Sequence, residues 1–473
     1  MRRTKIICTL GPSSSSKEII EEMMIKGMNI ARLNFSHGTH EEQQARADRV
    51  KQIREKLDLP VALLLDTKGP EIRTGLFKNE FENLVEGQAF KIVVEDIEGD
   101  KEKCSISYKE LYKDVIPGCK ILINDGAIGM EVLGVEGTDV ICKVNNSGKI
   151  GSQKNVHVSG FSVGLPAITE KDMDDIIFGI ENDFDFIAAS FTRRADDIRQ
   201  IRAVLEANGG KKIQIIAKIE NREGLDNLEE IIEEADGVMI ARGDLGLDIS
   251  PEEVPPAQKK IIRKCVEAGK PVITATQMLE SMIANPRPTR AEASDVANAI
   301  YDSTSAVMLS GETAAGKYPV ESLEMMGRII EKAEESTDYK RRFYTRRFSV
   351  STSITNAISH ATCATSHELG ASAIIPITKT GSTARMVSKF KPTCLIIGIT
   401  HSEKVRRQLA LSWGVHPFVI GAVKNTDELF SKAVEKSLET GLIKKGELVV
   451  LTAGVPTWIT GTTNIMKVEV AGE

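Results

Sequence analysis

Two pairs of oppositely charged residues, each following an apolar run, are the part of this sequence best suited to chemistry. Lys218 and Glu220 end one run, and Arg242 and Asp244 follow the next. Residues two apart in an extended strand point to the same face, so each pair places a cation beside a carboxylate. Two carboxylates and two cations at the ends of consecutive strands favour a site for a divalent metal and an anionic substrate. The alternative interpretation is two ordinary surface ion pairs.

Lys218 has two candidate roles. A lysine at the end of a strand forms a Schiff base, as in aldolases, where burial lowers its pKa. Glu220 on the same face, with Asp244 nearby, favours the charged ammonium instead. A permanent cation suits the stabilisation of a transferring phosphoryl group, and two carboxylates suit Mg²⁺. Two enzyme classes therefore stay open, a phosphotransferase and a Schiff-base aldolase. A third class, a metabolite sensor with a decayed active site, is disfavoured because Lys218, Glu220 and Asp244 are all present.

A repeating strand and helix pattern must position these residues. Strands are expected at 4–10, 28–35, 61–65, 184–189, 213–219, 237–241, 271–275 and 305–309. Such alternation demands a parallel sheet, and eight units are the number that closes a (β/α)₈ TIM barrel, whose active sites lie at the C-terminal ends of the strands. The polar residues expected there, as one site, are Arg32, Asn34, Ser36, Asp66, Thr67, Ser190, Arg193, Lys218, Glu220, Arg242, Asp244, Thr276, Ser310 and Glu312.

Two further regions interrupt and follow the barrel pattern. Short runs separated by Gly, Asn and Asp predict a small antiparallel β domain, expected as a small β-barrel, inserted between a strand and its helix. After the barrel, strands at 373–377, 394–398, 415–420, 448–452 and 466–470 alternate with helices and predict an open α/β domain. We assign 1–69 and 167–340 to the barrel, 70–166 to the insertion and 341–473 to the C-terminal domain. The charged stretch 338–348 is interpreted as a solvated linker.

Composition disfavours several classes of protein. The 61 basic and 67 acidic residues give a formal net charge of −6, and aromatic residues make up only 5%, which argues against nucleic-acid and membrane partners. The N-terminus lacks the apolar core of a signal peptide, and no apolar run is long enough to span a membrane. Seven widely spaced cysteines without a Cys-x-x-Cys motif suit reduced thiols. We expect a multidomain cytoplasmic protein.

Two glycine-containing segments could bind phosphate. The segment 311–318 resembles a P-loop, but Tyr318 stands where that loop needs a hydroxyl for magnesium, so we reject it. The loop Thr378, Lys379, Thr380, Gly381, Ser382 and Thr383 lies between a strand and a helix. Its hydroxyls, amides and helix N-terminus form either an anion site or an ordinary capped helix.

Five segments in this order and spacing resemble the pyruvate kinase family. They are RLNFSHG at 32–38, LDTKGPEIRT at 65–74, AKIEN at 217–221, ARGDLG at 241–246 and TATQMLESM at 274–282. The resemblance runs from end to end of the chain, including the inserted and C-terminal domains. It implies transfer of the phosphoryl group of phosphoenolpyruvate to ADP, giving pyruvate and ATP in the last step of glycolysis. It also implies an allosteric homotetramer.

The resemblance implies roles for the charged residues. Glu220 and Asp244 would bind Mg²⁺ or Mn²⁺, which bridges the enolate and carboxylate oxygens of the substrate. Lys218 would neutralise charge on the phosphoryl group in flight, which needs a fixed cation in a dry site. Arg32 would hold the phosphate.

Further implied roles concern the substrate carboxylate and the nucleotide. The backbone of Gly243 would approach the carboxylate, and Asp244 would bind the substrate through the metal. Thr276 would donate its hydroxyl to the carboxylate and lie near the carbon that is protonated. Arg73 and Lys154 would lie on the nucleotide side, beneath an inserted lid that excludes water.

The resemblance also implies a K⁺ site and an effector site. Asn34, Ser36, Asp66 and Thr67 would hold the K⁺ ion, and Glu71 is the residue type of potassium-dependent members. The loop 378–383 would bind a phosphorylated effector. The segment 456–460, with Trp458, departs from the family pattern, so no particular effector is assigned. The chain stops soon after Val470, without the additional C-terminal domain that some bacterial relatives carry.

Overall fold

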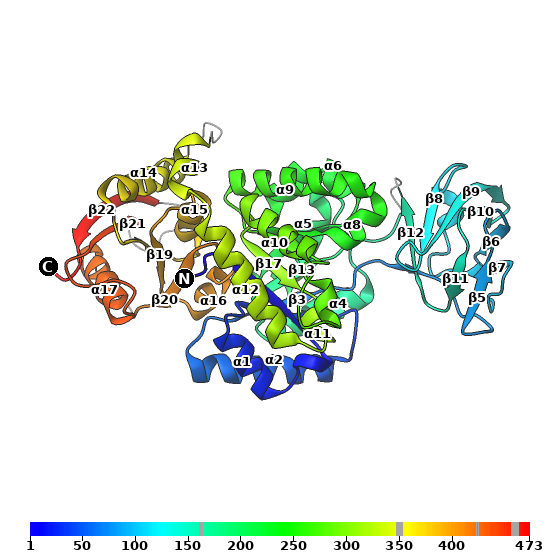
Figure 1. The fold of residues 1–473 in the computed structure, drawn as a ribbon, viewed down its shortest axis with the longest axis horizontal. Helices are drawn as coiled ribbons and strands as arrows, with labels where there is room; N and C mark the ends of the chain where they lie inside the picture. Colours follow the sequence, from blue (N-terminus) through cyan, green and yellow to red (C-terminus); the bar gives the residue numbers. More distant parts are fainter. Residues whose placement is uncertain (160–163, 347–352, 422, 424, 456–462) are drawn as a thin grey trace.

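The computed structural model describes residues 1–159, 164–346, 353–421, 423, 425–455 and 463–473. Three bodies lie in a row along its longest axis, with the barrel in the centre, the insertion at one end and the C-terminal region at the other (Figure 1). Within the described residues, no helix combines the length and the apolar character needed to cross a membrane.

Eight parallel strands form the closed barrel that the sequence predicts. They are β1 (Lys5–Leu10), β2 (Ile30–Asn34), β3 (Ala62–Asp66), β13 (Phe186–Ala189), β14 (Gln214–Ile219), β15 (Gly237–Ala241), β16 (Val272–Ala275) and β17 (Ala306–Leu309). Their order around the barrel is β1-β17-β16-β15-β14-β13-β3-β2. The strands read as nearly continuous apolar runs because their side chains alternate between the barrel interior and the helices outside, both of which exclude water. The (β/α)₈ prediction is confirmed.

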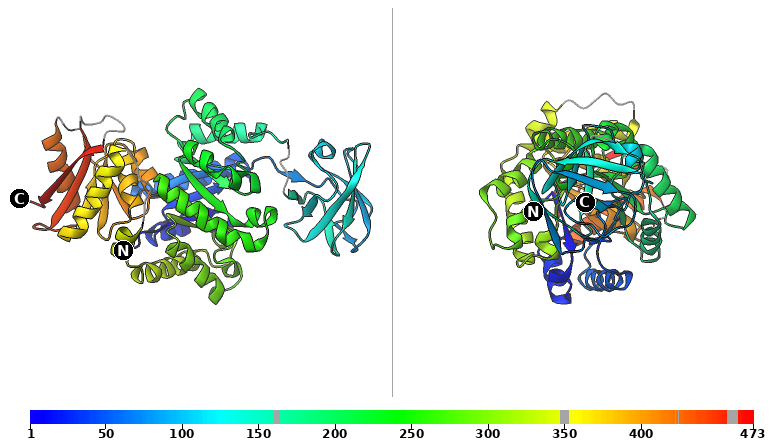
Figure 2. Two further views of the ribbon diagram at one scale, coloured as in Figure 1. Left: turned by 90° about the horizontal axis from the view of Figure 1, so that it is seen from above. Right: turned by 90° about the vertical axis from the view of Figure 1, so that its right-hand side faces the viewer.

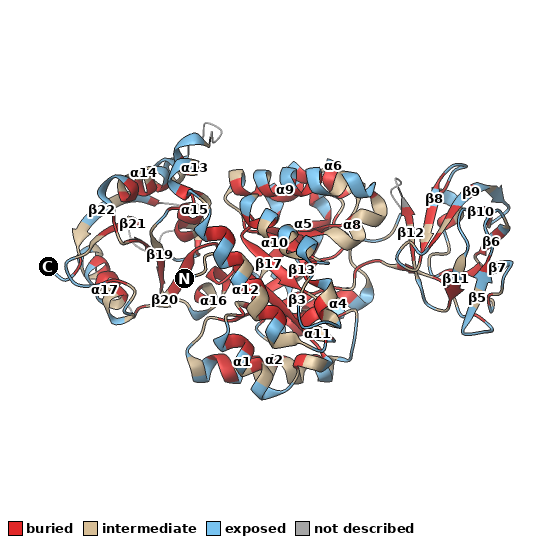
Figure 3. Ribbon diagram, viewed as in Figure 1, coloured by how far each residue is buried: buried red, intermediate tan, exposed pale blue. Residues whose placement is uncertain are grey.

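Helices surround this sheet, as the view along the long axis shows (Figure 2). They are α1 (Lys17–Ile25), α2 (His40–Leu57), α4 (Glu170–Glu181), α5 (Ala195–Ala207), α6 (Arg222–Asp226), α7 (Leu228–Glu234), α8 (Arg242–Asp248), α9 (Val254–Ala268), α10 (Arg290–Tyr301), α11 (Gly311–Ala314) and α12 (Pro319–Glu335). Several begin at a threonine or serine cap, such as Thr169 before α4 and Thr289 before α10. The faces that they turn to the sheet are buried, whereas their outer faces are exposed (Figure 3).

The insertion folds around a core of its own. Its elements are β4 (Ile72–Arg73), β5 (Phe81–Leu84), β6 (Ala89–Val93), β7 (Lys103–Ser105), α3 (Leu111–Asp114), β8 (Lys120–Ile123), β9 (Ile128–Glu136), β10 (Asp139–Val144), β11 (Gly148–Gly151) and β12 (Asn155–Ser159). A small β domain is therefore present as predicted. Its described strands pair as a seven-stranded sheet, β4-β12-β8-β9-β10-β6-β7, and a two-stranded ribbon, β11-β5, where we predicted a β-barrel. The two parts share one apolar core.

The C-terminal region is the predicted open α/β fold. Its elements are α14 (Ile354–Leu369), β18 (Ala373–Pro376), α15 (Ser382–Lys389), β19 (Leu395–Thr400), α16 (Glu403–Leu409), β20 (Val415–Val419), α17 (Thr426–Glu439), β21 (Leu448–Gly454) and β22 (Thr463–Val470). The sheet order is β20-β19-β18-β21-β22, and β22 alone runs antiparallel to its neighbour among these strands. Residues of α15 pack on one face of the sheet with Ile374 and Ile396, and residues of α17 pack on the other with Ile375 and Ile397.

The C-terminal region closes the end of the barrel opposite the insertion. Leu411, which is 1% exposed, follows α16 and belongs to the apolar cluster inside the barrel, with Ile7 and Ile30. Beside it, the Arg407 guanidinium pairs with the buried carboxylate of Asp185 at 2.8 Å. The two bodies are thus joined by apolar packing and by buried ion pairs.

Most of the stretch that we interpreted as a solvated linker is instead a packed helix, α13 (Tyr339–Thr345), whereas its last two residues, 347 and 348, lie outside the described residues. Tyr339 and Phe343 lie one helical turn apart and are both buried. Tyr339 contacts the Trp413 ring at a centroid distance of 5.1 Å, and Phe343 stacks on His360 at 4.9 Å. The basic residues between these aromatics made the stretch resemble a solvated segment and obscured its apolar stripe. The domain boundary that we placed after residue 340 falls within this helix.

Candidate active site

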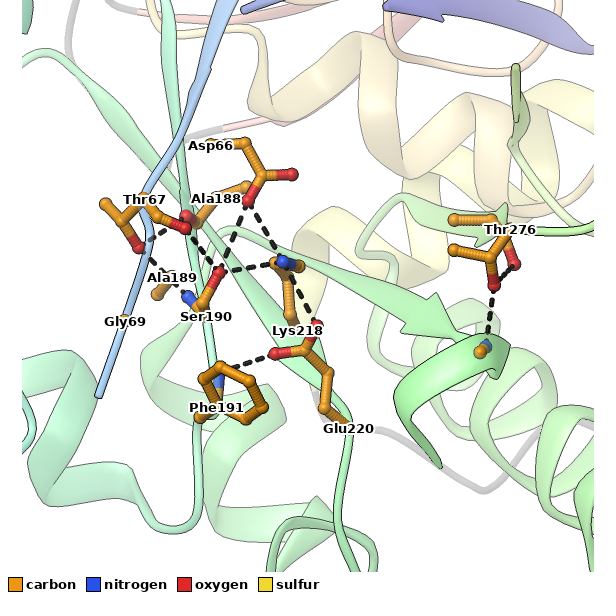
Figure 4. A network of polar contacts seen from close by, with 12 residues as sticks. Asp66, Thr67, Gly69, Ala188, Ala189, Ser190, Phe191, Lys218, Glu220 and Thr276 are labelled. Atoms are coloured by element: carbon orange, nitrogen blue, oxygen red, sulfur yellow. Dashed lines mark hydrogen bonds and ion pairs between the residues drawn. The ribbon is translucent and has the colours of Figure 1, made fainter. Parts of the chain in front are cut away.

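The ammonium group of Lys218 lies at the centre of a buried polar cluster at the C-terminal ends of β3, β13 and β14 (Figure 4). Its Nζ lies 3.0 Å from Asp66 Oδ1, 3.0 Å from Glu220 Oε1 and 2.7 Å from Ser190 Oγ. Burial alone would lower the pKa of this ammonium, but the two carboxylates outweigh burial and raise the pKa above its ordinary value. Lys218 is therefore a fixed cation, which disfavours the Schiff-base alternative, since an amine must lose its proton before it can attack a carbonyl group.

Asp66 ties Lys218 to Arg32 on the neighbouring strand. Arg32 Nε donates to Asp66 Oδ2 at 2.6 Å, and Arg32 Nη1 donates to Thr9 Oγ1 at 2.8 Å. Burial acts to raise the pKa of the Asp66 carboxyl, but Arg32 and Lys218 together hold it below its usual value. The carboxylate therefore stays charged and fixes two cations in one place.

Glu220 is a buried carboxylate whose charge is only partly compensated. It is 1% exposed, and its Oε2 accepts the backbone N–H of Phe191 at 2.6 Å. Burial raises the pKa of the Glu220 carboxyl, the charge of Asp244 adds to that rise, and Lys218 opposes it. The raised pKa shows that the negative charge of Glu220 lacks compensation, and a divalent cation would supply that compensation as a proton does. The oxygen donors of Glu220 and Asp244 therefore fit such an ion.

Asp244 lies in the first turn of α8, directly after β15. Our expectation that Arg242 and Asp244 share a face of a strand is therefore wrong, because the chain turns into a helix at Arg242. We also expected Arg242 to supply one of the two cations for an anionic substrate. Its guanidinium instead pairs with Asp295 at 2.7 Å and donates to the carbonyls of Ala275 and Thr276. Arg242 thus positions the loop after β16.

That loop holds Thr276 against Gly243. Thr276 Oγ1 accepts the backbone N–H of Gly243 at 2.8 Å and donates to the carbonyl of Ala275 at 2.6 Å. Thr276 has a φ of +66°, and Gln277 follows at +53°, in the left-handed region that non-glycine residues rarely adopt. A β-branched residue in this region is strained, and such strain is typical of functional sites. The predicted substrate contacts Gly243 and Thr276 are thus adjacent, and bonded to each other.

A cavity of about 450 Å³ opens between the barrel and the insertion. Glu71, His157, Arg193, Asp244 and Asp248 are among its lining residues. It is large enough for a nucleotide-sized ligand, and it reaches the carboxylate of Asp244. The two walls approach each other where His157 Nε2 of β12 lies 3.8 Å from Asp248 Oδ1 of α8.

The two residues predicted for the nucleotide belong to the insertion, and neither is among the residues that line this cavity, although their chain neighbours Ile72 and Asn155 are. Arg73 is at the end of β4 and donates to Glu71 Oε2 through Nε and Nη2, at 2.9 and 2.7 Å. Lys154, just before β12, is exposed, and its backbone bonds to Thr74. Glu71 is therefore the ion-pair partner of Arg73 in this structure.

The four residues predicted for K⁺ lie at the ends of the neighbouring strands β2 and β3. Asn34 and Asp66 are cross-strand partners in the β2–β3 pairing, and Thr67 follows Asp66. The backbone N–H of Ser36 donates to Asn34 Oδ1 at 3.0 Å. The Thr67 hydroxyl donates to the Ala188 carbonyl at 3.2 Å, and amide, hydroxyl and carboxylate oxygens are the hard ligands that suit a K⁺ ion.

The predicted effector loop lies far from this cluster, at the other end of the molecule (Figure 1). Gly381 has a φ of +85° and precedes α15, and Thr383 Oγ1 hydrogen bonds to Thr463 Oγ1 at 2.7 Å. The carbonyl of Thr380 accepts a hydrogen bond from Arg385 Nη2 at 3.1 Å. The segment 456–460, which we placed in the effector loop, lies outside the described residues.

Two contacts of Lys218 and Glu220 were missing from our set of functional residues. Ser190 was expected only as one of many polar strand ends, yet its hydroxyl contacts Lys218, Asp66 and the Thr67 carbonyl. Phe191 acts through its backbone N–H and has a φ of +54°. Nothing in a side chain identifies a backbone donor, so Phe191 gives no signal in the sequence.

Comparisons with known proteins agree with this geometry. A family model described as the pyruvate kinase barrel domain matches residues 1–323, and one described as the pyruvate kinase alpha/beta domain matches 356–469. A pyruvate kinase of Clostridium acetobutylicum is 54% identical over 471 residues, covering 99% of this chain and 100% of the relative. One of Staphylococcus haemolyticus is 50% identical over 475 residues, covering 100% of this chain and 81% of the relative. The solved structure of a pyruvate kinase from Cryptosporidium parvum matches with a TM-score of 0.95 at 40% identity, covering 99% of this chain and 96% of that chain.

Proposed function

Because the chain belongs to the pyruvate kinase family and transfers the phosphoryl group of phosphoenolpyruvate to ADP, we propose that Lys218, Glu220 and Asp244 form its catalytic centre. The observation that carries this proposal is the buried ammonium of Lys218, held by two carboxylates and a hydroxyl. In the reaction, the bond between phosphorus and the enol oxygen breaks, and a bond forms between phosphorus and a terminal oxygen of ADP. The electron pair stays on the enol oxygen, and the methylene carbon takes a proton to give pyruvate.

Lys218 and Arg32 would supply positive charge to the transferring group. Both cations are oriented in advance by Asp66, so the protein need not reorganise as charge develops. Such preorganisation is worth the most in a site that excludes water. Thr276 and the backbone of Gly243 would receive the substrate carboxylate, which would take the place of the hydrogen bond that now joins them.

Members of the pyruvate kinase family generally depend on metal ions, and we assign Glu220 and Asp244 as the protein ligands of Mg²⁺ or Mn²⁺. A divalent ion bound there supplies positive charge to the enolate and carboxylate oxygens of the substrate. Among the described residues, no cluster of three or more His, Cys, Asp or Glu side chains is placed to hold a metal ion. Two carboxylates completed by substrate oxygens and water are the arrangement that Mg²⁺ prefers.

We assign a K⁺ ion to the oxygens of Asn34, Ser36, Asp66 and Thr67. Its charge would add to that of Arg32, whose guanidinium is bonded to Asp66. The insertion would act as a lid that brings Arg73 and Lys154 to the nucleotide, and closure would exclude the water that competes with ADP for the phosphoryl group.

The wider setting of the enzyme is also proposed. All seven cysteines are free, and six of them are buried, which suits a reducing compartment such as the cytoplasm. A place in the last step of glycolysis, a homotetrameric state and a phosphorylated effector at 378–383 remain predictions from the family resemblance. The effector prediction is supported by the glycine-led N-terminus of α15.

The test is pyruvate formation from phosphoenolpyruvate and ADP, assayed with and without Mg²⁺ and K⁺. Turnover that needs both ions is the expected result. Turnover that ignores K⁺ would leave the reaction in place but remove our assignment of Asn34, Ser36, Asp66 and Thr67. Absence of turnover in every salt would overturn the catalytic assignment.

A further inference from the structure

A small cavity of about 20 Å³ lies where the C-terminal region meets the barrel, away from the catalytic centre. Four cationic side chains line it: Lys270 from the start of β16, Arg385 and Lys389 from α15, and Lys391 just beyond that helix. None of the described residues that line it is acidic. Positive charge is therefore concentrated at a joint between two bodies of the protein.

Lys391 is the most deeply buried of the four. It is 7% exposed, its Nζ lies 3.4 Å from the carbonyl of Thr304, and it lies over the Trp413 ring at 4.3 Å. Burial lowers the pKa of Lys391 well below its ordinary value, and the charge of Arg346 lowers it further, whereas Glu334 acts to raise it without forming an ion pair. Within the described structure, Lys391 makes no ion pair with a carboxylate. A buried cation without a counter-charge is costly unless an anion accompanies it.

Arg385 carries a second unsatisfied positive group. Its Nη1 is buried and has no hydrogen-bond partner in the described structure, although its Nη2 donates to the Thr380 carbonyl. Burial lowers the pKa of this guanidinium, and only the more distant Asp236 acts to raise it. Lys270, in turn, is bonded to the backbone carbonyls of Glu233 and Ala235, which carry only partial charge.

We propose that this cavity binds a small monatomic anion, chloride, between Lys270, Arg385, Lys389 and Lys391. The volume fits an ion of this size, since about 10–15 Å³ already accommodates one water molecule, and it excludes phosphate, a nucleotide or a sugar phosphate. The anion would neutralise charge from both bodies at once. It would also act on α15, because Arg385 reaches back to Thr380 in the loop before that helix. The inference does not depend on the proposed catalytic roles.

The test is the melting temperature of the full-length protein in potassium gluconate, chloride or phosphate at matched ionic strength. Gluconate is too large for the cavity and serves as the reference. We expect chloride to raise the melting temperature by about 2 °C in the wild type, because a ligand that binds only the folded state stabilises it. The rise should be lost in Arg385→Gln and, independently, in Lys391→Met.

Lys5→Met is the matched control. Lys5 is also a buried lysine at this joint, with its Nζ bonded to the carbonyl of Val415, but it does not line the cavity. The anion-dependent rise should persist in this variant.

An equal rise in all four proteins would overturn the proposal, because the anion would then be bound elsewhere, for instance at Arg32 and Lys218. A rise with chloride alone would support the proposal, whereas a rise with phosphate alone would contradict it, because phosphate is too large for the cavity. If chloride raises the melting temperature, crystals of the protein can be soaked in bromide, whose anomalous scattering marks its position. Absence of an anomalous peak beside Lys391 would also overturn the proposal.

Discussion

The Nζ of Lys218 lies 3.0 Å from the Oε1 of Glu220, and the environment raises the pKa of both groups. The lysine is held in its charged form, whereas the carboxyl is biased towards its neutral form because burial and Asp244 oppose its charge. The single positive charge of Lys218 therefore does not compensate the negative charge of the carboxylates around it. A divalent cation beside Glu220 and Asp244 would supply the missing positive charge.

Replacing Lys218 by Met should lower kcat by about 10²–10⁴-fold, because a preorganised cation is lost from the transition state. Binding of Mn²⁺, followed by electron paramagnetic resonance, should be largely retained. Lys211→Met is the control: Lys211 precedes the same strand at its other end, and its side chain is 81% exposed. Retained turnover in Lys218→Met would contradict the catalytic role.

Replacing Glu220 by Gln should abolish tight binding of the divalent ion and remove one component of the pH dependence of stability. In the metal-free wild type, the folded state holds a proton on Glu220 at pH values where the unfolded state has lost it. The free energy of unfolding should therefore fall as the pH rises through that window. Urea unfolding between about pH 4 and pH 8 should show this decline in the wild type and a weaker one in Glu220→Gln. Identical pH slopes would contradict a raised pKa.

Replacing Ser36 by Ala should raise the K⁺ concentration needed for half-maximal turnover by about tenfold, equivalent to about 1.4 kcal/mol of lost binding. The hydroxyl is one of four predicted ligands, and the fold at Ser36 depends on its backbone N–H, which the variant keeps. The measurement is turnover against K⁺ at constant ionic strength, with Na⁺ as the balancing ion. Ser15→Ala, on the loop after β1, provides a hydroxyl deletion outside the predicted set. An unchanged K⁺ requirement in Ser36→Ala would remove Ser36 from the site.

Replacing Ser382 by Ala should weaken the response to a phosphorylated effector and leave basal turnover intact. The residue begins α15, and the loop before it lies at the end of the molecule opposite the insertion. Turnover at low phosphoenolpyruvate, measured with a panel of sugar phosphates in wild type and variant, tests this. A fall in basal activity would identify the loop as structural, and a panel without any effect on the wild type would contradict the effector prediction.

Replacing Leu411 by Ala should destabilise the protein by about 2–5 kcal/mol, the usual cost of a cavity left by a large buried aliphatic side chain. Leu369→Ala, at a position that is 46% exposed, should change stability by much less. Thermal melting of both variants checks the comparison. Equal melting temperatures would mean that Leu411 does not seal the barrel.

The large elements were predictable because their signals are local. The β14 strand, for example, is a short run of mostly apolar residues flanked by helices, and its position follows from that local run. The convergence of Arg32, Asp66 and Lys218 was also predictable, because parallel strands in a barrel place their C-terminal ends at one rim.

Other features depended on contacts that no local pattern encodes. Arg242 was expected to face a substrate, but the chain enters α8 at that residue, and its side chain binds carbonyls on the next loop. Glu71 and Arg73 were given separate roles, yet they form an ion pair. The basic residues around Tyr339 and Phe343 indicated a solvated linker, although the two aromatics lie on one buried helical face. In each case a tertiary partner, absent from the local sequence, decided the outcome.

Leu411 gives the barrel a floor that comes from a different part of the chain. A chimera that exchanges C-terminal regions between relatives would therefore have to keep the segment that contains Leu411 with its own barrel. Otherwise the replacement side chain would have to match the barrel opening in size. A barrel expressed by itself would expose an apolar opening to water and tend to self-associate. Only one of the two outer regions is therefore independent of the barrel core: the insertion has a core of its own, whereas the barrel and the C-terminal region share a core residue and have to be inherited together.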